Sequence, residues 1–363
     1  MNEVAELAAA LVRIDSVNPA LIPGGAGETE IAGFVASWLR DAGLEVDVIE
    51  PVAGRPSVVG IARGRGGGRS LLLNAHLDTV GVAGMQDPFG ARVIDGRLYG
   101  RGSYDMKGAL AAALLAAADA SRLGLAGDVI VTAVADEELG SLGTEAVVEH
   151  VSADAAIVCE PTDLTVAIAQ RGFTGFEIET RGVAAHGSRP DLGVDAIALM
   201  GPVLVALEEL GRRLQEGRRH PLVGSASLHA SLIEGGHELS TYPARCVLTG
   251  ERRTLPGESL GEVERELHAA AGEAEVRLLV AREPFEIDEG HELVQAVLAA
   301  AGQTEPAGVL FWTDAALTAA AGIPTVLFGP AGEGAHAAVE WVEIASLERC
   351  REVYVATAAA LCA

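Results

Sequence analysis

The chain has 363 residues, with 26 Lys+Arg against 51 Asp+Glu, so its formal net charge is −25. A surface this acidic repels phosphate backbones and anionic lipid, and aromatic residues make up only 4% of the chain, so nucleic-acid and membrane-surface binding are both disfavoured. The length exceeds what one hydrophobic core usually supports, so we expect two domains, or one domain with a large insertion, in a soluble enzyme or binding protein.

Short β-branched apolar runs alternate with alanine-rich stretches, the pattern of an α/β fold. Outside the middle of the chain, the expected strands are Glu45–Ile49, Ser57–Ala62, Ser70–Ala75, Asp128–Ala135, Ala155–Cys159 and Thr325–Phe328. The expected helices there are Glu28–Ala42, Met106–Leu123, His291–Ala301 and Ile344–Leu361.

The middle of the chain follows a different order of elements. It predicts a strand, a helix, two strands, a helix and a strand at Phe173–Thr180, Asp195–Leu214, Ser225–Ile233, Ala244–Glu251, Glu258–Ala271 and Ala274–Val280. This βαββαβ order is that of the ferredoxin-like unit. We therefore expect a main α/β domain in two parts, residues 1–171 and 284–363, with an inserted domain at 172–283.

Two polar residues end the apolar strand LLLNAHLD. The period of two places His76 and Asp78 on the same face of the strand. Asp78 could then accept one ring N–H of His76 and leave the other nitrogen for a metal ion. Taken alone, the motif is explained as well by two strand-end residues that face solvent.

A glycine-rich turn, DGRLYGRGSYDMKG, precedes an alanine-rich helix. It places Asp105 where backbone N–H groups and a helix dipole would hold a carboxylate, and an ordinary helix cap is the simpler alternative. The crowding of Gly100, Gly102 and Gly108 indicates close approach of the backbone to another group. Lys107, the only lysine of the chain, lies in the same turn, and we assign it no catalytic role.

The strand Asp128–Ala135 runs directly into Asp136, Glu137 and Glu138. Acidic triplets are usually solvated, but open α/β sheets build their sites at the carboxyl ends of strands. Because neighbouring residues of an extended chain point in opposite directions, one glutamate could face a metal ion and the other a water molecule. A carboxylate beside such a water is the general-base arrangement of metallohydrolases.

Two further segments have the same form. Glu160 follows the apolar strand AAIVC, and His336 follows the strand TVLF through a Gly/Pro loop. Two histidines and three carboxylates suit two borderline metal ions with one bridging carboxylate. The candidate ligands are His76, Asp105, Glu138, Glu160 and His336.

The middle region offers two more candidates. His186 lies in a turn of small residues, and Arg253 lies at a strand end. Such residues are more often surface residues. If the inserted domain folds over the metal ions, His186 becomes an oxyanion donor and Arg253 a clamp for a substrate carboxylate.

The cysteines and the N-terminal residues bear on the compartment. Cys159, Cys246, Cys350 and Cys362 are far apart and form no CxxC pair, which predicts reduced, buried thiols. The sequence MNEVAELAAALVRIDS has acidic residues where a signal peptide needs Lys or Arg. The richest apolar run, Ala109–Ala118, is shorter than the roughly 18 residues of a membrane span. We expect a cytoplasmic protein.

Several segments together resemble one protein family. NAHLDTV, DGRLYGRGSYDMKG, DEELGS, CEPT, GVAAHGSRP, ERRTLPGE and GPAGEGAHAAVEWV resemble, in this order, the di-zinc aminoacylase and carboxypeptidase family. That family includes acetylornithine deacetylase and succinyl-diaminopimelate desuccinylase. The resemblance runs from about residue 70 to 343. It implies a mixed-sheet α/β catalytic domain of the zinc-exopeptidase type and an inserted ferredoxin-like α+β domain for lid and dimer contacts.

The resemblance also implies roles at the metal site. Asp105 would bridge both ions, His76 and Glu160 would complete one site, and Glu138 and His336 the other. Glu137 would be the general base and Asp78 would orient His76. The Asp105–Met106 peptide bond would be cis.

Outside the metal site, the resemblance implies three substrate contacts. His186 would stabilise the oxyanion, in many members across a homodimer formed by the inserted domains, and Arg253 would hold the substrate carboxylate. Ser240 stands where the family often has asparagine, and a hydroxyl cannot match the reach of the amide.

The implied activity is amide hydrolysis with two Zn²⁺ ions, or Co²⁺ in their place, on a small N-acyl amino acid or short peptide. An acetylornithine deacetylase-like activity leads, ahead of a dipeptidase or carboxypeptidase and of succinyl-diaminopimelate desuccinylase. Outside enzymes, the alternatives are a metal-bearing protein that binds acyl amino acids without turnover and a purely structural metal site. Glu137 favours an enzyme, because a binding protein needs no extra carboxylate beside the ligands.

Overall fold

The computed structural model describes residues 2–363 and divides into two compact units. Unit 1 comprises the chain up to Ile168 together with Ile287–Ala307 and Thr313–Ala363. Unit 2 comprises Ala169–Glu286 and Gly308–Trp312. Each unit has its own hydrophobic core.

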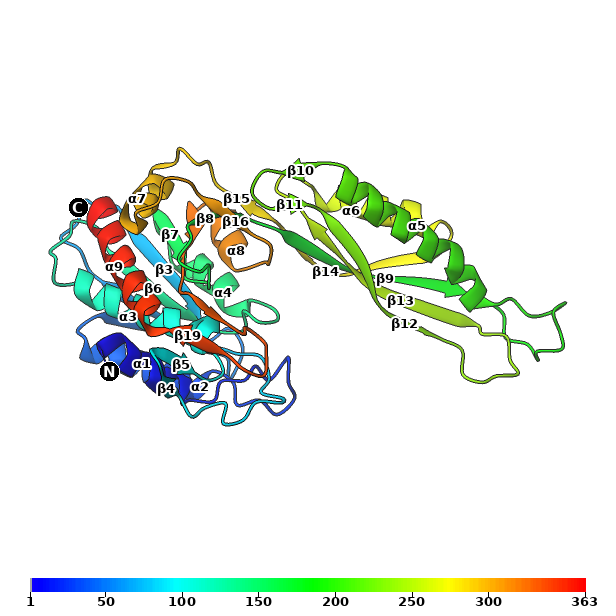
Figure 1. The fold of residues 1–363 in the computed structure, drawn as a ribbon, viewed down its shortest axis with the longest axis horizontal. Helices are drawn as coiled ribbons and strands as arrows, with labels where there is room; N and C mark the ends of the chain where they lie inside the picture. The colour runs from blue at the N-terminus through cyan, green and yellow to red at the C-terminus, as the bar shows by residue number, and fades with distance from the viewer. Residues whose placement is uncertain (1) are drawn as a thin grey trace. The chain divides into compact units, whose positions relative to one another are not determined.

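Unit 1 is built on a mixed sheet whose strands follow the order β1-β2-β6-β3-β7-β17-β8. Of these strands, β3, β6, β7 and β8 are labelled in Figure 1. The central strands β3, β6, β7 and β17 run parallel, whereas β2 is antiparallel to both β1 and β6. Two short strands, β15 and β16, pair with β8; β15 lies in unit 2, and β8 and β16 lie where the chain passes from one unit to the other. The bounds are β1 (Glu45–Ile49), β2 (Ser57–Ala62), β3 (Leu71–His76), β6 (Val129–Val134), β7 (Ala155–Val158), β8 (Ala167–Gln170), β15 (Phe285–Glu286), β16 (Ala307–Val309) and β17 (Thr325–Leu327).

Helices cover both faces of this sheet, which explains why its central strands are buried along their whole length. Every residue of β3, β6 and β7 is buried. Helix α3 (Gly108–Ala120) is itself buried on nearly all sides and packs against α1, α9 and the sheet. The other helices of this unit are α1 (Glu3–Val12), α2 (Thr29–Asp41), α4 (Leu142–His150), α7 (Glu292–Ala301), α8 (Ala315–Ala320) and α9 (Ile344–Leu361).

A small antiparallel sheet, β18-β19-β5-β4, carries the loops that lead to Asp105 and His336. Its strands are β4 (Arg92–Ile94), β5 (Arg97–Tyr99), β18 (Gly332–Glu333) and β19 (Trp341–Glu343). The predicted helix from Met106 begins later, because Asp105 and Met106 have non-helical backbone angles in the turn η1 (Ser103–Lys107). Asp105 is therefore not a helix cap, and the cap position of α3 belongs to Lys107. The Asp105–Met106 peptide bond is cis.

Unit 2 has the βαββαβ order and an antiparallel sheet in the order β12-β13-β9-β14. Both of its long helices lie on one face of this sheet (Figure 1), where Phe176, Leu248, Val263 and Leu267 form a buried core. The elements are β9 (Gly172–Arg181), α5 (Ala196–Glu216), β12 (Ser227–Gly235), β13 (Arg245–Thr254), α6 (Leu260–Ala271) and β14 (Glu275–Arg282), with a short hairpin of β10 (Arg219–His220) and β11 (Gly224–Ser225).

Two expectations from composition can be compared with the structure. All four cysteines are buried and unpaired, as predicted. No helix in residues 2–363 combines the length and apolar character needed to cross a membrane.

Candidate metal centre

The five predicted ligands converge at one edge of the sheet in unit 1. His76 is the last residue of β3, and Glu138 and Glu160 follow the ends of β6 and β7. The parallel register pairs His76 with Val134 and Asn74 with Val158, so these strands end close together. Asp105 comes from η1, and His336 from the loop between β18 and β19.

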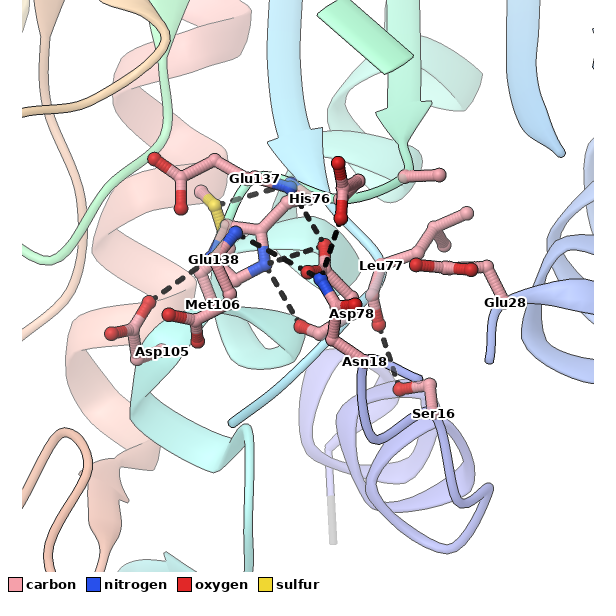
Figure 2. Close-up of polar contacts among 12 residues, drawn as sticks. Ser16, Asn18, Glu28, His76, Leu77, Asp78, Asp105, Met106, Glu137 and Glu138 are labelled. Carbon is pink, nitrogen blue, oxygen red and sulfur yellow. Dashed lines mark hydrogen bonds and ion pairs between the residues drawn. The ribbon is translucent and has the colours of Figure 1, made fainter. Parts of the chain in front are cut away.

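The carboxylate of Asp105 lies between the two histidines. His76 Nε2 is 3.1 Å from Asp105 Oδ1, and His336 Nε2 is 3.5 Å from Asp105 Oδ2. Each histidine also faces a glutamate, because His76 Nε2 is 4.0 Å from Glu160 Oε1 and His336 Nε2 is 3.0 Å from Glu138 Oε2. Figure 2 shows the carboxylate of Asp105 near His76. One carboxylate with an oxygen toward each of two ligand groups is the arrangement of a bridging ligand.

Two overlapping sets of side chains could each hold a cation. Ligand atoms of His76, Glu137 and Glu160 lie within 4.8 Å of one another, as do those of His76, Asp105 and Glu138. His, Asp and Glu are the usual ligands of catalytic zinc and related ions. The donor set therefore fits divalent metal ions, with Glu137 close to the same groups.

The electrostatics of the cluster also point to a missing positive charge. Four buried or half-buried carboxylates, Asp105, Glu137, Glu138 and Glu160, face only two histidines. Burial raises the pKa of Glu160 well above its usual range despite the nearby imidazole of His76, and burial and neighbouring carboxylates do the same for Glu137. Two divalent ions would neutralise four carboxylates.

The pKa values of both histidines are also raised, although burial by itself would lower them. Burial disfavours the charged form of His76, but its hydrogen bond to Asp105 and the nearby glutamates together raise its pKa well above the usual range. Hydrogen bonds to Asp105 and Glu138 raise the pKa of His336 to about 10. Glu138 Oε1 is buried without a hydrogen-bond partner among residues 2–363, which is what a carboxylate oxygen reserved for a cation would show.

Asp78 lies beside His76, but its carboxylate does a different task from the one predicted. The Nδ1 atom of His76 is 2.9 Å from the backbone carbonyl of Asp78 and 3.8 Å from its carboxylate. The backbone carbonyl therefore fixes the ring. The carboxylate instead accepts hydrogen bonds from the backbone N–H groups of Glu137 and Glu138, at 3.1 and 3.2 Å.

The sequence did not point to Glu340, which holds the Asp105 turn. Its buried carboxylate accepts hydrogen bonds from Arg101 Nη1 at 2.7 Å and from the backbone N–H groups of Gly102, Tyr104 and Asp105 at 3.0, 2.9 and 3.1 Å. Glu340 lies four residues after His336, inside a segment that the resemblance includes. Its spacing from His336 was the only available signal.

Asp314 is a second residue that the sequence did not indicate. It is buried at the start of α8, and its Oδ2 accepts a hydrogen bond from Thr144 Oγ1 at 2.5 Å. Burial raises the pKa of Asp314 to about 6, although the hydroxyl of Thr144 lowers it. Its charge also raises the pKa of both Glu137 and Glu160, so it belongs electrostatically to the cluster.

The three candidates of unit 2 fall at two ends of its sheet. Gly187 N, next to His186, donates a hydrogen bond to Ser240 O at 2.7 Å, so the His186 and Ser240 loops lie together beyond the β9–β13 ladder. Arg253 lies at the other end of β13, stacked on Phe173 and bonded to Glu251 at 2.6 Å. The structure therefore brings His186 and Ser240 together but not Arg253.

Comparison with known proteins agrees with this architecture. Residues 72–360 match the model of peptidase family M20/M25/M40. The chain is 32% identical over 367 residues to an acetylornithine deacetylase of Myxococcus xanthus, covering 95% of this chain and 93% of the relative. It is 31% identical to an acetylornithine deacetylase of Erwinia tasmaniensis, covering 89% and 88%.

Solved structures share the fold at lower identity. Aminopeptidase PepT from Bacillus cereus matches with a TM-score of 0.82 at 21% identity, over 98% of this chain and 97% of that one. The Bacillus subtilis protein YXEP, described as a dinuclear metal-binding peptidase of the M20 family, matches with a TM-score of 0.76 at 18% identity, over 99% and 97%. The mixed α/β fold of zinc-exopeptidase type is thus that of these proteins. The chain belongs to peptidase family M20/M25/M40 and is a hydrolase of amide bonds.

Proposed function

We propose that this chain removes the acyl group from N-acyl amino acids, with an acetylornithine deacetylase-like activity that depends on two divalent metal ions, Zn²⁺ or Co²⁺. The observation that carries the proposal is the Asp105 carboxylate between His76 and His336, with Glu137 beside them. The deacetylase of Myxococcus xanthus, similar over nearly the whole chain, supports the choice of substrate class.

Each metal ion would be held by one histidine and one glutamate. His76 and Glu160 would hold one ion, Glu138 and His336 the other, and Asp105 would bridge them. Bound ions of this kind polarise an amide carbonyl and make water a better nucleophile near neutral pH.

Glu137 is the residue that we assign as general base. Its carboxylate lies within 4.8 Å of ligand atoms of His76 and Glu160, so it can reach a water molecule that the ions would hold. The hydrogen bond from its backbone N–H to Asp78 fixes the residue within the turn. In the proposed reaction, Glu137 takes a proton from the attacking water and returns it to the nitrogen of the leaving amine.

Substrate contacts would come from unit 2. We assign Arg253 to the substrate carboxylate, His186 to the oxyanion and Ser240 to a lesser polar contact. The β13 strand has ten residues, so about 30 Å separates its two ends. His186 and Arg253 of one copy therefore cannot contact the same small substrate, whereas residues from two copies could.

This separation favours a homodimer through unit 2. Strand β12 lies at the edge of its sheet and exposes Leu232 and Ile233, and α5 exposes Val205. An unpaired edge with apolar side chains is suited to pair with a second copy. The variant Leu232→Asp should sediment as a monomer in analytical ultracentrifugation and lose most of its activity. A wild-type protein that sediments as a monomer and is fully active would contradict the dimer.

A dipeptidase or carboxypeptidase activity is the second candidate. Both reactions cleave an amide next to a carboxylate. A succinyl-diaminopimelate desuccinylase activity is the third candidate among enzymes. Outside enzymes, the alternative is a protein that binds acyl amino acids without turnover, in which Glu137 would have no catalytic role.

The test is amine release after loading with Zn²⁺ or Co²⁺. The panel holds N-acetyl-ornithine, N-acetyl-methionine, N-succinyl-diaminopimelate and several dipeptides. We expect turnover of N-acetyl amino acids, and a loss of roughly 10²- to 10⁴-fold in kcat for Glu137→Gln with both metal ions retained. Turnover of dipeptides alone would select the second candidate. No turnover with two ions bound would favour the binder.

A further inference from the structure

A buried cluster of charged residues lies next to the metal-ligand set and includes the N-terminal segment of the chain. We call it the Arg55 cluster and define it as Asn18, Glu28, Arg55 and Asp136. Arg55 Nε and Nη2 donate to the two carboxylate oxygens of Glu28, each at 2.7 Å, and Nη2 also donates to Asp136 Oδ1 at 2.9 Å. All four residues are buried.

Asn18 connects this cluster to Asp78. Its Nδ2 donates to Asp78 Oδ2 at 2.8 Å and to Asp136 Oδ1 at 2.9 Å, while its Oδ1 accepts from Arg55 Nη2 at 3.2 Å. The backbone of the same segment is joined to the residues after β3, because Asn18 N donates to Thr79 O. Ser16 Oγ likewise donates to Leu77 O (Figure 2). The side-chain amide therefore has little freedom to move.

The network contacts the turn that carries Glu137 and Glu138 at two places, the side chain of Asp136 and the backbone N–H groups that bond to Asp78. Asp136 opens the turn with a positive φ of 67°, a conformation that a non-glycine residue adopts at a cost. Its side chain is held by Arg55 and Asn18. The backbone N–H groups of the next two residues are held by the carboxylate of Asp78, which Asn18 fixes in turn.

We propose that Arg55 and Asn18 are positioning residues for Glu137 and Glu138, so that the segment before residue 72 completes the catalytic centre of unit 1. This proposal rests on the proposed function, because it names what holds the assigned general base and one assigned ligand. Asn18, Glu28 and Arg55 all lie outside the residues that match the family model.

The partners of this cluster distinguish it from another arginine of unit 1 that bonds to two carboxylates. Arg351 makes a comparable pair of bonds, to Asp119 Oδ2 at 2.7 Å and to Glu3 Oε2 at 2.9 Å, and also joins the N-terminal segment to the rest of unit 1. Its partners lie on or beside helices, and none belongs to the 136–138 turn. Arg351 is also more exposed than Arg55, so Arg351→Lys controls for the loss of an arginine that bonds to two carboxylates away from the turn.

The experiment compares these two variants with the wild type as full-length, metal-loaded proteins. Lysine retains the charge but lacks the planar fork that lets Arg55 reach Glu28 and Asp136 together. For Arg55→Lys we expect kcat to fall by about 10- to 100-fold, with KM changed by less than about threefold, because substrate contacts are untouched. The visible absorption of the Co²⁺-loaded protein should also change, since Glu138 is displaced. Arg351→Lys should leave both readouts at wild-type values.

Asn18→Ala provides a second, milder variant that keeps the Arg55–Glu28 pair, in case Arg55→Lys does not fold. We expect it to lower kcat by about 10-fold and to change the Co²⁺ spectrum in the same direction. Wild-type kcat and spectrum in the folded variant, or a fall no larger than in Arg351→Lys, would overturn the proposal. If the wild type turned over no substrate, the proposed function would fail, and the Co²⁺ spectra would still test whether the cluster positions Glu138.

Discussion

Two neighbouring regions of unit 1 are both buried and rich in carboxylates, but they balance their charge differently. In the Arg55 cluster, one guanidinium bonds to Glu28 and Asp136, and Asn18 supplies donors to Asp136 and Asp78. In the metal-ligand set, four carboxylates face two histidines, and Glu138 Oε1 has no partner among residues 2–363. One region carries its own counter-charge, and the other depends on charge from outside the chain.

This difference explains how a catalytic centre can be rigid and incomplete at once. Carboxylates that must stay available to a cation cannot be neutralised by fixed arginines, because the arginines would occupy the same oxygens. The arginine–carboxylate pairs, formed by Arg55 and by Arg101, therefore lie next to the predicted metal ligands and do not include them. Carboxylates in this neighbouring layer hold the backbone of the ligand loops by hydrogen bonds. Asp78 accepts from the backbone N–H groups of Glu137 and Glu138, and Glu340 accepts from that of Asp105.

The largest expected effect comes from removing the bound metal ions. Treatment with a chelator should abolish activity and lower the free energy of unfolding by about 4 kcal/mol for each ion, for free metal at about 1,000 times its Kd. Urea unfolding at pH 7 with and without metal measures this. Equal unfolding midpoints in the two samples would mean that the ligand set needs no cation.

The next effect comes from breaking another buried pair with its own counter-charge, that of Glu340 and Arg101. Glu340→Ala would leave the Arg101 guanidinium buried without its carboxylate, since the Arg101 side chain is only 2% exposed. We expect a loss of about 3–5 kcal/mol in unfolding free energy. Glu340→Gln, which keeps an acceptor, should lose less. Urea unfolding of both variants checks the order, and a harmless Glu340→Ala would contradict the role assigned to Glu340.

The smallest effect comes from removing one excess carboxylate. Asp314 has a folded pKa of about 6, above its ordinary value of 3.8, so its protonation favours the folded state. Its contribution is fully present below pH 3.8 and is lost as pH rises through about 6. Metal-free Asp314→Asn should therefore lack this loss and be about 1–3 kcal/mol more stable than wild type at pH 7.

Urea unfolding of both metal-free proteins at pH 4, 5, 6 and 7 measures this difference. The two stability curves should diverge as pH rises. Parallel curves would show that Asp314 is not an excess charge in the cluster.

The sequence predicted those parts of the site that follow a regular element. His76, Glu138 and Glu160 each come at or just after an apolar strand, so the period of a strand and the meeting of parallel strand ends suffice to bring them together. The ferredoxin-like order of unit 2 was equally readable, because its strands and helices alternate with clear apolar periodicity.

The supporting residues could not be predicted for a physical reason. Asn18 bonds to Asp78 and Asp136 across 60 and 118 residues of sequence, and no local pattern marks such a contact. Arg55 lies in a loop where an arginine is usually exposed. The role expected of the Asp78 carboxylate was wrong in its partner, because strand periodicity gives the face of a side chain but not which of several nearby donors it accepts.

The most direct test of the two-metal centre is the number of ions bound per chain, measured by elemental analysis after saturation with Zn²⁺ and gel filtration. The account predicts two ions per wild-type chain, two in Glu137→Gln, and the loss of tight binding of both in Asp105→Ala, since Asp105 would serve both sites. One ion or none in the wild type, or two in Asp105→Ala, would contradict it.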